Sequence, residues 1–344
     1  MVEIILVFWV IIQLLVILAF NILIYLDYTL FKETISIFKM KLILYNHFHN
    51  GDHYFSQPLI KAIRKYNPEI EIDLCISCYD YLYSDIENIT VIHDSPLERG
   101  VERCQLPYYN VDENTVAISI WIGCSDDTFF KEACSVRIYN SFKNRYVEKF
   151  NINLPDILDI ELLPRTPITD IYNFLNWKDT HNSSIIFYNA LFPRSGQKTS
   201  STDHSIIIDR LCTLFPTIYF ITSDKLSDKN NNISTVCDFN YIQTYTGEHL
   251  CKNTKMYPYC DLIISFDVGS CLNYIEEEVL KSKANILHIA CTPHFFNQLS
   301  YNVENTDLYN LFLDKCVYCE ASDTSQTIEV IVNNIMKHIT INNI

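Results

Sequence analysis

The sequence has few glycines and few basic residues. It contains 6 glycines in 344 residues, and its 26 Lys and Arg residues are outnumbered by 41 Asp and Glu residues, for a net charge of −15. Because phosphate backbones are bound by clustered Lys and Arg, this charge argues against a nucleic-acid partner. Hydrophobic residues make up 49% of the chain, which is too many for a disordered protein. The composition therefore predicts a folded, acidic protein.

The cysteines do not suggest a disulfide framework. There are 13 of them, an odd number, and Cys75 and Cys78 have CxxC spacing in a segment that we expect to form a strand. A structural zinc site needs four convergent ligands. We therefore expect reduced, mostly buried thiols and no metal.

Charged residues are missing between residues 4 and 26, a run long enough to cross a bilayer as one helix. It lacks the features of a removable signal peptide. Lysines follow the run and Glu3 precedes it, which favours the bulk of the chain on the cytosolic side. We expect a single-pass membrane anchor through residues 4–26. In the alternative, translation starts at Met40 and the protein is cytoplasmic.

The length of the chain predicts two domains of about 150 residues each. Prolines cluster midway, at Pro155, Pro164 and Pro167. We expect an anchor and tether over 1–39, a first domain over 40–165 and a second over 166–344.

Strand-like and helix-like segments alternate in both halves, which predicts parallel βαβ units. We expect strands at 41–46, 71–77, 90–94, 115–123, 184–190, 217–223, 261–267 and 285–290. We expect helices at 59–66, with Pro58 in its first turn, at 135–152, at 204–215, capped by Asp203, and at about 270–282. The predicted fold class is α/β: two Rossmann-like, doubly wound domains that face a cleft, preceded by one transmembrane helix.

The stretch HFHNGDHYFSQP, residues 47–58, follows the first strand. Gly51 permits a sharp turn and a close approach of ligand to backbone. Asp52 is a candidate general base, and the alternative is that it caps the helix. Asn50, Gly51 and His53 are candidate substrate-binding residues. His47, His49 and His53 do not have a recognised metal-ligand spacing, so we expect no metal there.

A second loop, FDVGSCLN, has the same place in the second half. Asp267 ends a strand, Gly269 allows a tight turn, and Ser270 can open the next helix, whose backbone N–H groups favour a diphosphate. Of Glu276, Glu277 and Glu278 we expect at least two on a solvated face.

Together and in order, these segments resemble the ADP-heptose:lipopolysaccharide heptosyltransferases, glycosyltransferase family nine, which have the GT-B fold. The opening of the family is similar to KLILYNHFHNGDHYFSQPLIKAIRKYNPEIEIDL, and RIYNSFKNRYVEKFNINLPDI resembles the helix before the interdomain linker. In the second half the matching segments are SIIFYNALFPRSGQKTSSTDHSIIIDRL, TIYFITS and YCDLIISFDVGSCLNYIEEE.

The resemblance implies roles for several residues. Asp52 matches the catalytic base, Lys198 or else Arg194 the residue that meets donor phosphates, and Asp267 and Gly269 the donor-binding turn, which Ser270 continues. The histidine that the family has five positions after this aspartate is Leu272 here, with Asn273 beside it, so heptose cannot be assumed as the donor sugar.

The resemblance implies an inverting, metal-independent glycosyltransferase without a cofactor. Its donor would be a nucleotide-diphosphate sugar, and its acceptor a hydroxyl of a glycan, a lipid-linked molecule or a protein. Two alternatives remain: a non-catalytic module that binds a sugar nucleotide or a protein, and a nucleotide-sugar epimerase.

Overall fold

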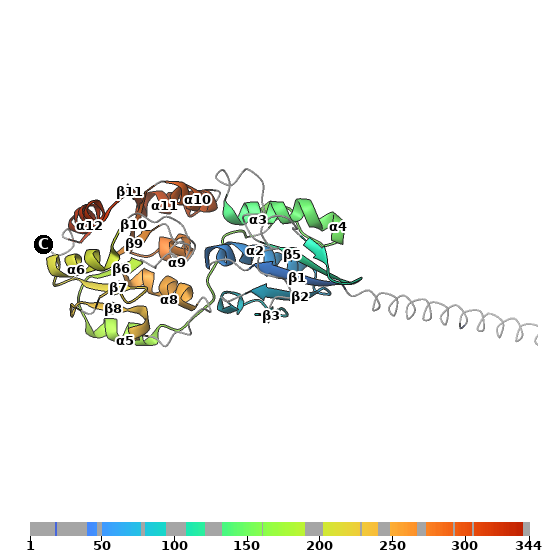
Figure 1. Cartoon of the computed structure of the whole chain (residues 1–344), viewed down its shortest axis with the longest axis horizontal. Coiled ribbons are helices and arrows are strands. Elements are labelled where there is room, and N and C mark those ends of the chain that lie inside the picture. The colour runs from blue at the N-terminus through green and yellow to red at the C-terminus, as the bar shows by residue number, and fades with distance from the viewer. Residues whose placement is uncertain are drawn as a thin grey trace, which may run out of the picture.

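The chain forms two α/β units, each built on one sheet with helices packed against it (Figure 1). The computed structural model describes residues 18, 40–46, 50–76, 80–93, 108–120, 133–159, 161–189, 202–227, 229–239, 248–266, 273–291, 293–304 and 306–339. This confirms the predicted α/β class with two units, each built on a mainly parallel sheet. The predicted membrane span, apart from Leu18, lies outside the described residues, and no helix within them is long and apolar enough to cross a bilayer.

The first sheet has the strand order β3-β2-β1-β5-β4. Its strands are β1 (Lys41–Asn46), β2 (Glu71–Ile76), β3 (Thr90–Ile92), β4 (Tyr108–Asn110) and β5 (Thr115–Ser119). Strand β1 is central and pairs in parallel with β2 and β5, whereas β4 is antiparallel to β5. Both faces of β1 are buried, because Leu42 and Leu44 join the main core and Ile43 and Tyr45 a smaller cluster on the opposite face. This explains its nearly continuous apolar sequence.

The first unit also contains helices. They are α2 (Asn50–Tyr66), η1 (Asp80–Tyr83), α3 (Cys134–Phe142), the π-helical η3 (Lys143–Val147), α4 (Glu148–Phe150) and η4 (Ile157–Asp159). The helix predicted over 135–152 is thus present, with a π-helical segment in its middle.

Helix α2 begins much earlier than predicted. It starts at Asn50 and contains Pro58 in its interior, so the prediction of Pro58 in the first turn is wrong. The buried side chains of Phe55, Leu59 and Ile63 are spaced four residues apart and form one apolar face that runs past the proline. Burial of that face outweighs the backbone hydrogen bond that Pro58 cannot donate. Gly51 and Asp52 therefore lie in the first turn of a helix.

The second sheet has the strand order β11-β10-β9-β6-β7-β8, and its described pairings are all parallel. Its strands are β6 (Ile185–Asn189), β7 (Tyr219–Thr222), β8 (Ile233–Thr235), β9 (Leu262–Phe266), β10 (Asn285–Ala290) and β11 (Cys316–Glu320). Numbered along the chain, this is the order 3-2-1-4-5-6 of dinucleotide-binding sheets.

The helices of the second unit include several that the sequence did not reveal. They are α5 (Tyr172–Thr180), α6 (His204–Leu214), α7 (Val236–Phe239), α8 (Glu248–Met256), η5 (Tyr257–Tyr259), η7 (Asn273–Ile275), α9 (Glu277–Leu280), α10 (His294–Val303), α11 (Tyr309–Lys315) and α12 (Thr324–His338). Asp203 caps α6 as predicted, because its carboxylate accepts from the backbone N–H groups of Ser205 and Ile206.

The prediction of a helix over 270–282 is wrong for residues 273–282, the part of this range that the structure describes. The chain forms η7 and the short α9 instead, and between them Glu276 has an extended backbone (φ −64°, ψ 145°). This break turns the Glu276 side chain toward Thr166, in the linker between the two units, residues 161–170.

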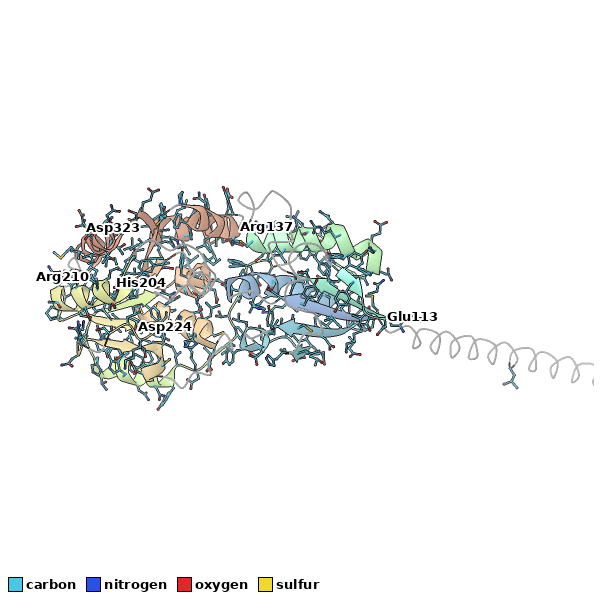
Figure 2. All side chains as sticks on the ribbon, viewed as in Figure 1. Glu113, Arg137, His204, Arg210, Asp224 and Asp323 are labelled. Carbon is cyan, nitrogen blue, oxygen red and sulfur yellow. The ribbon has the colours of Figure 1, made fainter. Side chains whose placement is uncertain are left out.

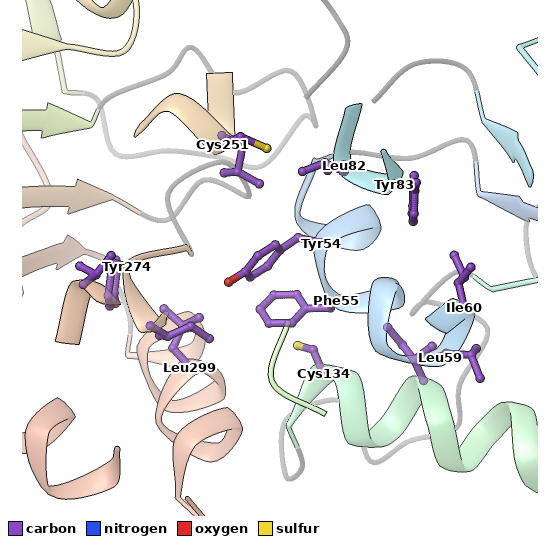
Figure 3. Packing of buried hydrophobic residues seen from close by; sticks show 14 of the residues in the cluster. Tyr54, Phe55, Leu59, Ile60, Leu82, Tyr83, Cys134, Cys251, Tyr274 and Leu299 are labelled. Atoms are coloured by element: carbon purple, nitrogen blue, oxygen red, sulfur yellow. The ribbon is translucent and has the colours of Figure 1, made fainter. Parts of the chain in front are cut away.

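A single hydrophobic cluster joins the two units. Tyr54 and Phe55 of α2 belong to the same buried cluster as Cys251, Tyr274 and Leu299 of the second unit. Figure 3 shows the Tyr54 ring pointing from α2 toward the second unit. This packing holds the two units together. The domain boundary between residues 165 and 166 stays a prediction.

Candidate active site

Each sheet has a switch point, at which successive strands are added on opposite sides of a central strand. In the first sheet the switch lies between β1 and β5, and in the second between β6 and β9. Loops that follow such a pair diverge and leave a crevice at the carboxyl ends of the strands, which is where open α/β sheets bind ligands.

Polar residues lie at the carboxyl end of β1, β5 and β6 and one residue before the carboxyl end of β9. Asn46 ends β1 and Ser119 ends β5, while Asn189 ends β6 and is in register with Ser265 of β9. All four are buried. Buried polar groups require partners, so these four positions mark a polar edge in each sheet.

The predicted base, Asp52, lies in the first turn of α2, six residues after Asn46 at the end of β1. Asn50 and Gly51 lie in the same turn of α2. Of these three residues the structure describes the backbone and not the side chains. Their predicted roles therefore rest on their position at the carboxyl end of the central strand.

His53 packs inside the first unit. Its side chain is fully buried, and its Nδ1 lies 2.9 Å from the Tyr83 hydroxyl. Ser56 Oγ lies 3.0 Å from the same hydroxyl and donates to the carbonyl oxygen of His53. His53 thus fixes α2 against η1, and its predicted contact with substrate stays a prediction.

Several predicted site residues lie outside the described residues. They are His47 and His49 of the first loop, Arg194 and Lys198 of the predicted phosphate-binding loop, and Asp267, Gly269, Ser270 and Leu272 of the predicted donor turn.

A hydrogen-bonded network supports the carboxyl end of β6. Ser223 Oγ donates to Asn189 Oδ1 at 2.5 Å and accepts from Asn253 Nδ2 at 3.1 Å. Asn189 Nδ2 donates to the Tyr257 hydroxyl. The buried Asn273, next to the altered family histidine position, donates to the Leu250 carbonyl at 2.9 Å. Asn273 therefore holds η7 against α8.

A neutral histidine also lies at this end of the second sheet. His204 is the first residue of α6, and its Nδ1 is 2.8 Å from the hydroxyl of Tyr188 on β6 (Figure 2). Burial lowers the pKa of His204 to about 4, although the nearby Asp203 opposes the shift. Apart from the position of His204 at a predicted helix start, no sequence pattern indicated this pair.

The least expected feature is the environment of Glu276, where the two units meet. Glu276 is 3% exposed. Its Oε1 accepts from Thr166 N at 2.9 Å and lies 3.1 Å from the Tyr54 hydroxyl, and its Oε2 accepts from Thr166 Oγ1 at 3.1 Å. One carboxyl group thus joins α2, the linker and the segment before α9.

Burial raises the pKa of Glu276 to about 7, and the hydrogen bonds from Thr166 and Tyr54 oppose this shift. Burial, together with the nearby Glu276 charge, also raises the pKa of Tyr54 well above its usual value. Glu276 therefore titrates near neutral pH.

Two of the three consecutive glutamates are solvated, as predicted. Glu277 is partly exposed and Glu278 is exposed, whereas Glu276 is buried. Local spacing did not predict this difference, because Glu276 lies before α9 with an extended backbone, and its side chain contacts Tyr54 and Thr166, which are distant in the sequence.

Within the described residues, no group of three His, Cys, Asp or Glu side chains is placed to hold a metal ion. The described cysteines are free thiols, including Cys75 in β2. Cys316 and Cys319 repeat the CxxC spacing, but both lie in strand β11. Residues three apart in a strand point to opposite faces of the sheet, so this pair cannot converge on one ion.

No protein-family model matches the chain, and no curated protein matches it. The fold is similar to several solved structures. One is a glycosyl transferase family 9 protein from Veillonella parvula DSM 2008, with a TM-score of 0.46 and 11% identity, over 87% of this chain and 89% of that one. Its family is the one that the sequence motifs resemble.

Two further solved structures are similar. TibC from enterotoxigenic E. coli H10407, an iron-containing dodecameric glycosyltransferase, has a TM-score of 0.40 and 11% identity, over 74% of this chain and 60% of TibC. MnaA from S. aureus, solved with UDP, has a TM-score of 0.38 and 10% identity, over 88% of this chain and 97% of MnaA. Because these TM-scores are below 0.5, function has to be argued from the chain's own residues.

Proposed function

We propose that the protein is a glycosyltransferase of the GT-B type that moves a sugar from a nucleotide-diphosphate donor to an acceptor hydroxyl. The donor would bind at the carboxyl end of the second sheet, whose strand order is that of dinucleotide-binding sheets. The acceptor, a glycan, lipid-linked molecule or protein, would bind near the start of α2.

The observation that carries this proposal is the meeting of the two switch points. Tyr54, two residues after Asp52, contacts Glu276, which follows β9 in the chain. The start of α2 after β1 is thereby held beside the segment after β9. An acceptor at one strand end and a donor at the other would approach each other at this junction.

The proposed chemistry needs a base and a group that stabilises the leaving diphosphate. Asp52 would take the proton from the acceptor hydroxyl as it attacks the donor sugar. Lys198, or else Arg194, and the turn with Asp267, Gly269 and Ser270 would hold the diphosphate as negative charge develops on it. The reaction would invert the sugar configuration and would need no metal or cofactor.

Two parts of the proposal concern location. A membrane anchor through residues 4–26, with the bulk of the chain in the cytosol, would place the enzyme near lipid-linked acceptors. A start at Met40 would give the same catalytic units as a cytoplasmic protein.

The test is a thermal-shift screen of the full chain against ADP, UDP, GDP and their sugars, repeated with Asp267→Ala. A ligand that binds the folded state raises its melting temperature by mass action. We expect a shift with one nucleotide family that is lost in the variant. The matched control is Asp314→Ala, on the exposed side of α11, which should keep the shift.

A second measurement separates the alternatives. Analysis of products from the bound nucleotide sugar shows a new glycosidic bond for a transferase, and an altered sugar still on its nucleotide for an epimerase. Absence of any thermal shift would contradict a nucleotide-sugar enzyme and favour a non-catalytic module.

A further inference from the structure

The Tyr54 hydroxyl has two acceptors but one hydrogen. It lies 3.1 Å from the Pro164 carbonyl oxygen and 3.1 Å from Glu276 Oε1. A phenol hydroxyl donates one hydrogen bond. When Glu276 is ionised, Tyr54 can donate fully to one of these oxygens, and the other loses that bond in a buried site.

Protonation of Glu276 resolves this conflict. The carboxyl group can then donate from Oε1 to the Tyr54 oxygen, and Tyr54 can donate to Pro164. The two bonds from Thr166 remain possible, because a protonated carboxyl group keeps acceptor capacity on both oxygens. Only in the protonated state can both contacts of the Tyr54 hydroxyl, to Pro164 and to Glu276, be complete hydrogen bonds.

Of the charges around Glu276, Lys255 favours the ionised form, but its effect on the pKa of Glu276 is smaller than that of burial. On α8, Lys255 is paired with Glu278, and Cys251 is a buried thiol whose pKa is raised by burial. On the linker, Arg165 is paired with Glu161 at 2.5 Å and lies 3.4 Å from Glu277. Among the described residues, no Lys or Arg forms an ion pair with Glu276 itself.

We infer that Glu276 is a positioning residue that acts as a proton-operated latch, holding α2 and the linker against the second unit when protonated and loosening them when ionised. The inference rests on the proposed function where it concerns Asp52, two residues from Tyr54 on α2. The burial that raises the pKa of Glu276 to about 7 places this change near neutral pH.

Hydrogen exchange of the full chain without nucleotide tests the latch. Peptides that cover residues 50–60 and 161–170 are followed from pH 5 to pH 8, with rates corrected for the chemical pH dependence of exchange. We expect local opening of these peptides to increase by at least about tenfold, because ionisation favours the opened state. Peptides from β6 should change much less.

Three variants separate the latch from a general effect of pH. Glu276→Gln stays neutral, so its two peptides should show no pH-dependent opening. Glu329→Gln, an exposed glutamate on α12, should behave as the wild type. Thr166→Val removes one donor to the carboxylate, so the midpoint of the change should move to higher pH.

Several results would overturn the inference. These are opening that is independent of pH in the wild type, opening in Glu276→Gln that follows the wild-type pH dependence, or an unmoved midpoint in Thr166→Val. The last variant keeps the test decisive if Glu276→Gln does not fold. Since no nucleotide is present, a failed latch leaves the thermal-shift result intact, and a missing thermal shift leaves the latch intact.

Discussion

The hydroxyl of Tyr54 lies 3.1 Å from Oε1 of Glu276, although the two residues are 222 positions apart in the chain. Tyr54 is fully buried and Glu276 nearly so. This contact joins the helix that follows the central strand of the first sheet to the segment that follows β9 of the second. It fixes where the two predicted ligand-binding edges meet.

Tyr54→Phe should lower the free energy of unfolding by about 1–3 kcal/mol, because it leaves the Pro164 carbonyl without its donor in a buried site. Urea unfolding at pH 6 would measure this. Tyr172→Phe is the control, because Tyr172 is 63% exposed and its variant should match the wild type. Equal stability of all three proteins would contradict the contact.

The free energy of unfolding should fall as pH rises from about 4.5 to 7, relative to that of Glu276→Gln. The folded pKa of Glu276, about 7, exceeds the ordinary value of 4.5, so the folded state binds more protons across this interval. The stabilisation is complete below the unfolded pKa and is lost as pH passes the folded pKa. The loss should be on the order of 2–3 kcal/mol. A constant difference between the two proteins would argue against the raised pKa.

Ser223→Ala should destabilise the second unit by about 1–3 kcal/mol, because Asn189 Oδ1 and Asn253 Nδ2 each lose a buried partner. It should also weaken nucleotide binding, since Asn189 ends β6 at the predicted donor crevice. Urea unfolding and the nucleotide thermal shift measure the two effects. Ser183→Ala, at an exposed position before β6, should change neither.

Asp52→Asn should lower the turnover rate by about 10²–10⁴-fold while nucleotide binding stays unchanged, as expected for loss of a general base. Asparagine can still satisfy a helix start, so the melting temperature should be close to that of the wild type. Asp314→Asn is the control for turnover. A variant with full activity would leave Asp52 as a residue that only supports the helix.

Turnover should survive EDTA, because the proposed mechanism stabilises the leaving diphosphate with protein groups. The assay compares the rate before chelation, after chelation, and after addition of Mg²⁺ or Mn²⁺. Loss of turnover that a divalent ion restores would contradict this mechanism.

The sequence predicted the strands better than the helices. Segments such as 41–46 and 285–290 match β1 and β10 residue for residue, because strands buried on both faces are short apolar runs with clear ends. The start of α2 was missed because Pro58 is a strong signal for a helix start, and burial of Phe55 overrides it. Strand β4 was missed because its three residues are too short for a period to appear.

The sequence predicted which strand ends form the candidate site, but it did not predict which side chains contact one another there. The position of Asp52 after the first strand follows from local patterning. The partnership of Tyr54, Thr166 and Glu276 depends on how three distant segments pack, and no local rule contains that information. The burial of Glu276 could not be predicted from its spacing to Val279 and Leu280 either, because its extended backbone takes it off the helical face that those residues share.

The sequence separation between Tyr54 and Glu276 also has a consequence for biosynthesis. Ribosomes add about 5–20 residues per second, and N-terminal units generally fold first, so the 222 residues between the two side chains represent on the order of 10–40 seconds. During that interval α2 can pack on its own sheet while the Tyr54 hydroxyl still faces water. The newly made first unit must therefore tolerate, for a time, an apolar surface around Tyr54 and Phe55 that the finished protein covers.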